Sequence, residues 1–134
     1  MTKYKARKTV VDGITFDSKA EALRYLVLKD RQTKGEISFL ARQVRFDLLP
    51  SVKYQGADRS TGPLWYTVDF AYVIVATGEQ VCEDVKGYAD DVFPIKRHMM
   101  LALRGINVIV PNAPAYGAKK PVKSRKPSIV RRAA

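Results

Sequence analysis

The residues with the clearest chemical potential are two aspartates and a lysine in neighbouring apolar segments. Asp69 lies within Tyr66–Phe70, while Asp84 and Lys86 lie two residues apart within Val81–Gly87. Two carboxylates on one side of a sheet repel each other unless a cation lies between them, and their hard oxygen atoms suit Mg²⁺. An ammonium group beside them could contact a phosphate oxygen or a water molecule. These residue types therefore indicate a divalent-cation site of the kind that assists phosphoester hydrolysis.

A β-hairpin would bring these three side chains together. The segments predict a hairpin whose turn centres on Thr77–Gly78. In that register Asp69 faces Lys86 and Ala71 faces Asp84. The two aspartates then form a diagonal pair on one face of the sheet, with Cα atoms roughly 7–8 Å apart.

Other interpretations of the same residues remain open at this point. Asp69 and Lys86 could form an ordinary cross-strand ion pair, and a bulge or a one-residue shift would break the predicted register. Glu83 competes with Asp84 as the second acid. Strand alternation points Glu83 to the face opposite Lys86, so we favour Asp84.

A helix is expected before the hairpin, beginning at Ser18. Ser18 and Glu21 have the spacing of a capping box, and Gly35 follows Lys34 as a stop signal. The predicted buried stripe of this helix consists of Ala22, Tyr25, Leu26 and Leu28.

The remaining segments complete an α/β (α+β) domain. We expect strands at Ile37–Leu49, Trp65–Val75, Gln80–Gly87 and Ile106–Val110, a long turn-rich connection at Ser51–Leu64 that is strand-like at its start, and a second helix at Pro94–Arg104. A strand, helix, strand crossover makes the last strand parallel to the second arm of the hairpin. The predicted order αβββαβ gives a mixed central sheet flanked by helices.

Charge is concentrated at the two ends of the chain. The net charge is +11 over 134 residues, of which residues 119–134 contribute +7 and the first eight contribute +4. The basic residues of these two arms are Lys3, Lys5, Arg7, Lys8, Lys119, Lys120, Lys123, Arg125, Lys126, Arg131 and Arg132. We expect a basic arm at 1–16, one folded domain at 17–116 and a disordered basic tail at 117–134. A neutral body with basic arms is typical of a polyanion binder, because each phosphate contact releases counterions; arms that only aid solubility are the alternative.

Composition excludes several classes of protein. One cysteine cannot form a disulfide framework. Apolar stretches fall short of the ~20 residues that a membrane span needs, and the N-terminus lacks a secretory h-region. We therefore expect a cytoplasmic protein without a membrane partner.

Several motifs together resemble a known nuclease superfamily. Tyr66–Phe70 and Val81–Gly87 resemble the PD-(D/E)XK signature. Lys5–Thr9 with Asp12–Glu21 resembles a family of small phage and prophage proteins known only as a domain of unknown function, itself similar to archaeal-type Holliday-junction resolvases. The resemblance spans about residues 4–110. It implies a restriction-endonuclease-like core and a metal-dependent endonuclease that hydrolyses DNA phosphodiesters, selects DNA structure as Holliday-junction resolvases do, and acts in phage DNA recombination or processing.

The resemblance also implies roles for individual residues. The matching catalytic positions are Glu21, Asp69, Asp84, Lys86 and Lys96, and the implied ligands of Mg²⁺ or Mn²⁺ are Asp69, Asp84, the Val85 carbonyl and Glu21. Val68 replaces the proline of the signature, which carries no ligand. Glu21 could instead only cap its helix, and Lys96 could be a solvated lysine.

Partners follow from the same features. The connection at 51–64, with Lys53, Tyr54, Arg59 and the nearby Trp65, is the candidate contact for branched DNA. A homodimer would suit a two-fold junction, with Met99, Met100 and Leu103 as apolar surface, although core burial explains these residues equally well. The competing function is a non-catalytic basic nucleic-acid-binding protein, and a nuclease-derived protein that has lost activity is a third interpretation.

Overall fold

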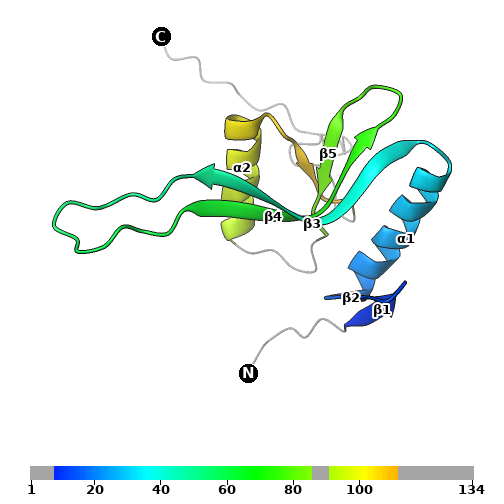
Figure 1. The fold of residues 1–134 in the computed structure, drawn as a ribbon, viewed down its shortest axis with the longest axis horizontal. Helices are drawn as coiled ribbons and strands as arrows, with labels where there is room; N and C mark the ends of the chain where they lie inside the picture. Colours follow the sequence, from blue (N-terminus) through cyan, green and yellow to red (C-terminus); the bar gives the residue numbers. More distant parts are fainter. Residues whose placement is uncertain (1–7, 86–90, 112–134) are drawn as a thin grey trace, which may run out of the picture.

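The structure, a computed structural model, describes residues 8–85 and 91–111. Its elements are β1 (Thr9–Val11), β2 (Ile14–Phe16), α1 (Lys19–Thr33), β3 (Ile37–Leu49), β4 (Leu64–Ile74), β5 (Gln80–Glu83), α2 (Val92–Arg104) and β6 (Val108–Ile109). From α1 onward the order is the predicted αβββαβ. The fold is a mixed α+β domain whose four-stranded sheet has the order β3-β4-β5-β6 (Figure 1).

The parallel crossover is confirmed. β3, β4 and β5 pair antiparallel, and β6 pairs parallel with β5, with Cys82 beside Val108. The helix between β5 and β6 begins at Val92, two residues before the predicted start at Pro94. Pro94 therefore lies within the first turn, where the backbone N–H groups have no helical partners and a proline is tolerated. Gly105 ends it in the left-handed region, with φ of 67°.

The predicted hairpin register is wrong by two residues. Ala71 lies opposite Cys82 and Phe70 opposite Glu83, whereas the prediction paired Ala71 with Asp84. The difference comes from the turn. The Ile74 N–H donates to the Glu79 carbonyl at 2.9 Å, so Ile74 and Glu79 face each other. The turn is therefore centred one residue earlier than Thr77–Gly78, and every facing pair shifts by two. A shift of two residues preserves the face on which each side chain lies.

Two hydrophobic clusters lie on opposite faces of β4 and β5. Phe70, Tyr72 and Val81 pack with α1, whereas their neighbours Ala71 and Cys82 pack with α2. Since neighbouring residues of a strand point to opposite faces, the two helices cover opposite sides of the sheet.

Helix α1 differs from the prediction in one position of its buried face. Ala22, Tyr25 and Leu28 are buried, but Leu26 is 44% exposed. Successive helical residues are about 100° apart, so Leu26 lies well to the side of a buried face centred on Tyr25. Ser18 caps the helix as predicted, because its Oγ accepts the Glu21 N–H at 3.1 Å.

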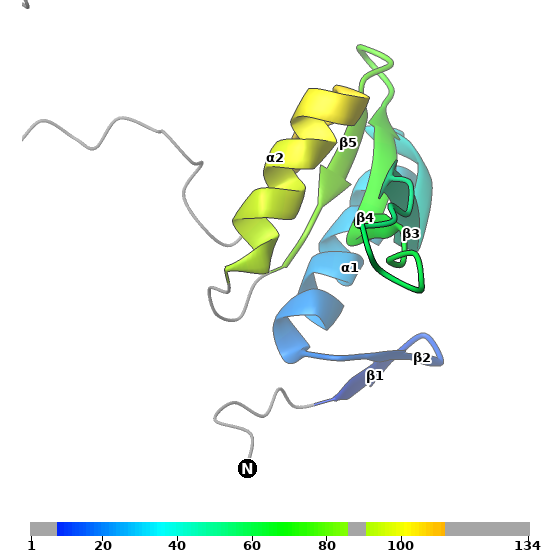
Figure 2. The ribbon, with the colours of Figure 1, turned by 90° about the vertical axis from the view of Figure 1, so that its left-hand side faces the viewer.

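A small hairpin precedes α1 and was not predicted. β1 and β2 pair through a turn at Asp12–Gly13, where both residues have positive φ, 51° and 73°. Phe16 is fully buried and packs against Tyr25 with ring centroids 5.1 Å apart. Residues 9–16, which we assigned to the basic arm, therefore belong to the folded body, next to the start of α1 (Figure 2).

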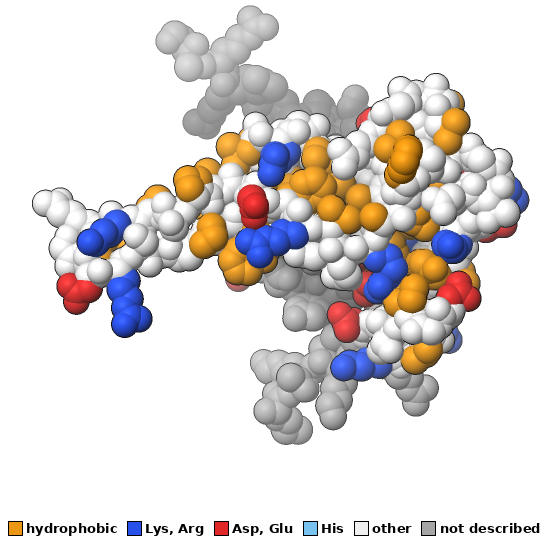
Figure 3. All heavy atoms as spheres, viewed as in Figure 1, with side chains coloured by type: hydrophobic (Ala, Val, Ile, Leu, Met, Phe, Trp, Pro, Cys, Tyr) orange, Lys and Arg blue, Asp and Glu red, His pale blue; other side chains and the backbone are white. Residues whose placement is uncertain are grey.

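The most prominent feature is an arm that projects from the body. It consists of the outer ends of β3 and β4 and the connection between them (Figure 1). The connection is not a strand, but Val52 and Thr61 bond across it, at 2.7 Å and 3.0 Å. Figure 3 shows Lys and Arg side chains at the tip and the foot of this arm, with exposed hydrophobic side chains between them.

Candidate active site

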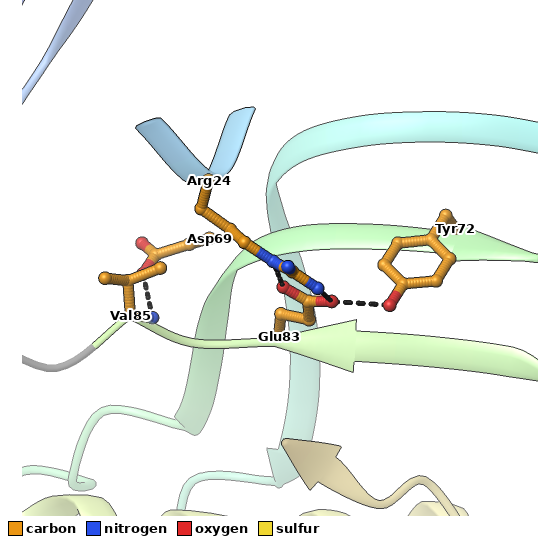
Figure 4. A network of polar contacts seen from close by, with 5 residues as sticks. All are labelled: Arg24, Asp69, Tyr72, Glu83 and Val85. Atoms are coloured by element: carbon orange, nitrogen blue, oxygen red, sulfur yellow. Dashed lines mark hydrogen bonds and ion pairs between the residues drawn. The ribbon is translucent and has the colours of Figure 1, made fainter. Parts of the chain in front are cut away.

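Asp69 and Asp84 come together where β4 and β5 diverge. Asp69 Oδ2 accepts the Val85 N–H at 2.8 Å (Figure 4). The Asp84 N–H donates to the Ile109 carbonyl at 2.9 Å. Continuing the observed register brings the two aspartates level with each other, closer than the diagonal pair we predicted. Asp84 is only 5% exposed, and its Oδ2 accepts the hydroxyl of Tyr66.

Glu21 reaches the same place from α1. Gln43 Nε2 lies 3.1 Å from Glu21 Oε1 and 3.3 Å from Asp69 Oδ1, so this amide bridges the two carboxylates. The helix cap at Ser18 uses only the backbone N–H of Glu21. Capping and site are thus compatible: the Glu21 backbone serves the helix while its carboxylate faces Asp69.

An irregularity in the sheet makes this convergence possible. Gln43 has a positive φ of 50°, and it lies between the pairs Arg42–Phe70 and Val44–Val68, which keep one register. On one side of the irregularity Val68 packs in the α2 cluster; on the other Phe70 packs in the α1 cluster. In a regular strand Val68 and Phe70 would share a face, but here they lie on opposite faces of the sheet. Asp69, between them, is the residue at which β4 changes face. It is therefore accessible to groups from both helices.

Sequence reasoning missed Gln43. Positive φ is common for glycine and asparagine but uncommon for glutamine, so nothing in the local sequence indicates an irregularity there. The irregularity is visible only in the structure, where Arg42 contacts Phe16 of the α1 cluster and Val44 packs against the α2 cluster.

The electrostatics of the site are those of crowded, half-buried acids. Burial raises the pKa of Asp69 to about 8, and hydrogen bonding and charge from Asp84 add to the effect. Burial, with the charge of Asp17, also raises the pKa of Glu21. Burial and Asp84 raise the pKa of Tyr66, so its hydroxyl stays a donor. Asp69 is therefore the carboxyl group of the site that most favours a proton or a cation at neutral pH.

The two aspartates open into a cleft of about 370 Å³. Its lining residues are Trp65, Tyr66, Thr67, Asp69, Asp84, Val92, Phe93 and Lys96. Lys96 comes from the first turns of α2, and its Nζ lies 5.8 Å from the centre of the Trp65 ring. The predicted accessory cation thus shares a cleft with both predicted acids.

Glu83 has a separate role, consistent with the choice of Asp84. It is fully buried on the α1 side, where both carboxylate oxygens bind Arg24 at 2.7 Å and Oε2 accepts the Tyr72 hydroxyl at 2.5 Å (Figure 4). Its oxygens are thus used in a buried network away from Lys96.

The donor set suits a hydrated divalent cation. Within residues 8–85 and 91–111, no group of three or more His, Cys, Asp or Glu side chains is arranged to hold a metal ion. Mg²⁺, however, usually keeps several waters and uses one or two carboxylates together with substrate phosphate. Asp69 and Asp84 supply such a pair of oxygen ligands, with Val85 beside them.

Several predicted residues lie elsewhere. Lys53 and Arg59 lie in the connection of the arm, and Lys8 is exposed beside β1. Lys86, Lys3, Lys5, Arg7, Lys119, Lys120, Lys123, Arg125 and Lys126 lie outside the described residues. On α2, Met100 is fully buried, which removes it from any dimer surface, while Leu103 is 49% exposed.

Comparison with known proteins gives the family. The model of the family described as "Protein of unknown function (DUF1064)" matches residues 1–109, and the chain belongs to this family. No curated protein and no solved structure matches it significantly. Neither of the two described helices is long and apolar enough to cross a membrane.

Proposed function

We propose that this protein is a metal-dependent endonuclease that hydrolyses DNA phosphodiesters and prefers branched DNA. The observation that carries the proposal is the cleft that Asp69 and Asp84 share with Lys96, together with the Gln43 amide that links Asp69 to Glu21. These residues come from α1, β3, β4, the end of β5 and α2, so the fold as a whole assembles the cluster. Acids gathered in this way destabilise a protein unless they serve a ligand or a reaction.

In this proposal Asp69 and Asp84 hold Mg²⁺ or Mn²⁺, with the Val85 carbonyl and Glu21 as further oxygen donors. When bound, such an ion supplies Lewis-acid polarisation of a phosphate and of a water. Lys96 is placed to contact a non-bridging phosphate oxygen from the opposite wall of the cleft. Lys86 follows Val85 directly in the sequence and is the proposed catalytic lysine.

Hydrogen-bond donors hold the acids in place. Tyr66 donates to Asp84, Val85 donates to Asp69, and Gln43 donates to both Asp69 and Glu21. Each of these donors fixes one carboxylate oxygen of its partner. Positioning of this kind is what reaction at a phosphorus centre requires of a protein.

DNA binding is assigned to the basic parts of the chain. The arm carries Lys53 and Arg59 on an extended projection, and the cationic terminal segments add long-range attraction to phosphates. The arm and the cleft together would give DNA two separate contact regions, which suits the branched substrate that we propose.

Incubation with supercoiled plasmid and with a synthetic four-way junction, in Mg²⁺ and in EDTA, tests the proposal. We expect Mg²⁺-dependent cleavage with preference for the junction, and its loss in Asp84→Asn while DNA binding persists. Metal-independent binding without cleavage would support the non-catalytic alternative. Cleavage retained by Asp84→Asn would overturn the assignment of the site.

A further inference from the structure

We propose that Trp65 is a stacking platform for an unpaired nucleobase beside the cleft, so that the preferred substrate has an unstacked nucleotide next to the cleaved bond. This inference rests on the proposed function, because it takes the ligand of the cleft to be DNA. It goes further by naming the feature of branched DNA that the site recognises.

The position of Trp65 is unusual for so large an apolar side chain. Trp65 lies near the start of β4, at the foot of the arm, and is 42% exposed, whereas the neighbouring Tyr66 is buried. It lines the same cleft as Asp69 and Asp84. An indole at the entrance of a polar cleft offers an aromatic face to a ligand rather than to the core.

Two cations accompany the ring. The guanidinium carbon of Arg45 lies over the ring, 4.5 Å from its centre, and Lys96 Nζ lies over the ring at 5.8 Å. Arg45 comes from β3 and Lys96 from α2, so the cations approach from different elements. An aromatic ring with cations over it is a combination that binds single-stranded nucleic acid: bases stack on the ring or on the plane of a guanidinium group, and the phosphates pair with the cations.

The same arrangement discriminates against intact duplex. A base within a duplex is already paired and stacked on both faces, so reaching Trp65 would cost its unstacking energy. A base at a branch point, a flap or a single-stranded end has lost part of that stacking. Trp65 therefore favours binding of substrates in which a nucleotide beside the cleft is unpaired and unstacked.

The fluorescence of Trp65 can report on stacking at this ring, because Trp65 is the single tryptophan of the chain. We would titrate the full-length protein in EDTA with a single-stranded oligonucleotide, the same sequence as a duplex, and a single strand with abasic sites at every position. We expect strong quenching of tryptophan fluorescence by the single strand and weak quenching by the other two at equal occupancy, measured by anisotropy. Equal quenching by the abasic strand would overturn the proposal.

Substitutions give a second, independent measurement. Trp65→Ala should weaken binding of a flap or four-way junction by about tenfold or more and leave duplex binding nearly unchanged, and Trp65→Phe should restore part of the loss. Phe39→Ala, which removes an aromatic side chain that is 82% exposed near the start of β3 and outside the arm's connection, is the matched control. Equal weakening of duplex and branched binding by Trp65→Ala would contradict stacking, and thermal unfolding of each variant checks the fold.

These measurements in EDTA need no cleavage, so the two proposals fail separately. A protein that shows base-dependent quenching but never cuts DNA keeps the recognition and loses the nuclease. If the Trp65→Ala variant cuts junctions as well as the unchanged protein does, the nuclease proposal stands and the proposal of a stacking platform fails.

Discussion

Arg24 and Glu83 form a bidentate ion pair inside the protein, with Arg24 Nε and one terminal nitrogen each 2.7 Å from a carboxylate oxygen. Arg24 lies three residues after Glu21 on α1, and Glu83 lies directly before Asp84 at the end of β5. The pair therefore ties together the two elements that supply Glu21 and Asp84. It is a positioning contact for the site, on the face of the sheet away from Lys96.

Breaking this pair should destabilise the fold. Glu83→Ala leaves the Arg24 guanidinium and the Tyr72 hydroxyl without their buried partner, a change that typically costs about 3–5 kcal/mol. Urea unfolding measures the loss. Asp30→Asn, which removes the exposed Asp30–Lys34 pair on the same helix, is the control and should hardly move the midpoint. Equal midpoints for the two variants would contradict the role of Glu83.

The two functions of the α1 start can be separated by substitution. Ser18→Ala removes the cap and should cost about 1 kcal/mol of stability while leaving cleavage unchanged. Glu21→Gln keeps the backbone bond to Ser18 and should leave stability nearly unchanged while lowering cleavage at least tenfold. Unfolding midpoints and single-turnover cleavage rates, measured on both variants, give the comparison. The reverse pattern would make Glu21 a capping residue only.

The raised pKa of Asp69 predicts a pH-dependent stability for the metal-free protein. Because this pKa is about 8 in the fold and ordinarily 3.8, the folded protein holds the proton more tightly than the unfolded chain. Between these two pH values the folded state binds more protons, so stability falls as pH rises. In EDTA the melting temperature should decline over this window, and Asp69→Asn should remove most of the decline.

A divalent cation should act in the opposite direction. A cation that binds the ionised pair Asp69 and Asp84 competes with the proton, so Mn²⁺ should raise the melting temperature more at pH 8 than at pH 5. Calorimetric scans at the two pH values, with and without the ion, make the comparison. An equal shift at both pH values would place the ion elsewhere.

The basic C-terminal segment should govern the salt dependence of binding. Deleting residues 119–134 removes seven positive charges and should lower the slope of log affinity against log salt by about 0.9 for each cation that contacts a phosphate. Cleavage should persist at low salt. An unchanged slope in fluorescence-anisotropy titrations would show that this segment does not touch DNA.

Much of the fold follows from local signals in the sequence. The cap at Ser18, the stop at Gly105 and the alternating strand patterns predict the element order and the parallel last strand. The two-residue error in the turn preserves strand parity, but the change of face at Asp69 lies outside what strand parity predicts. The exact partner of Asp69 is sensitive to that error, and it was predicted wrongly.

The parts that could not be predicted depend on tertiary contacts. The Arg24–Glu83 pair joins residues far apart in sequence, and either residue alone looks like a solvated charge. The positive φ of Gln43 carries no propensity signal, yet it accompanies the change of face of β4 at Asp69. The hairpin at β1–β2 was hidden because its three-residue strands are too short for a periodic pattern.

The projecting arm also makes the two walls of the cleft unequal. One wall of the cleft continues into the arm through Trp65, and the other is the start of α2 with Lys96. A polynucleotide has distinct 5′ and 3′ ends, so on the proposed function a strand laid along unequal walls would make different contacts in its two polarities, and one polarity would bind more tightly. Each protein molecule would then nick a single strand of fixed orientation, and paired incisions across a symmetric branch would take two molecules facing opposite ways.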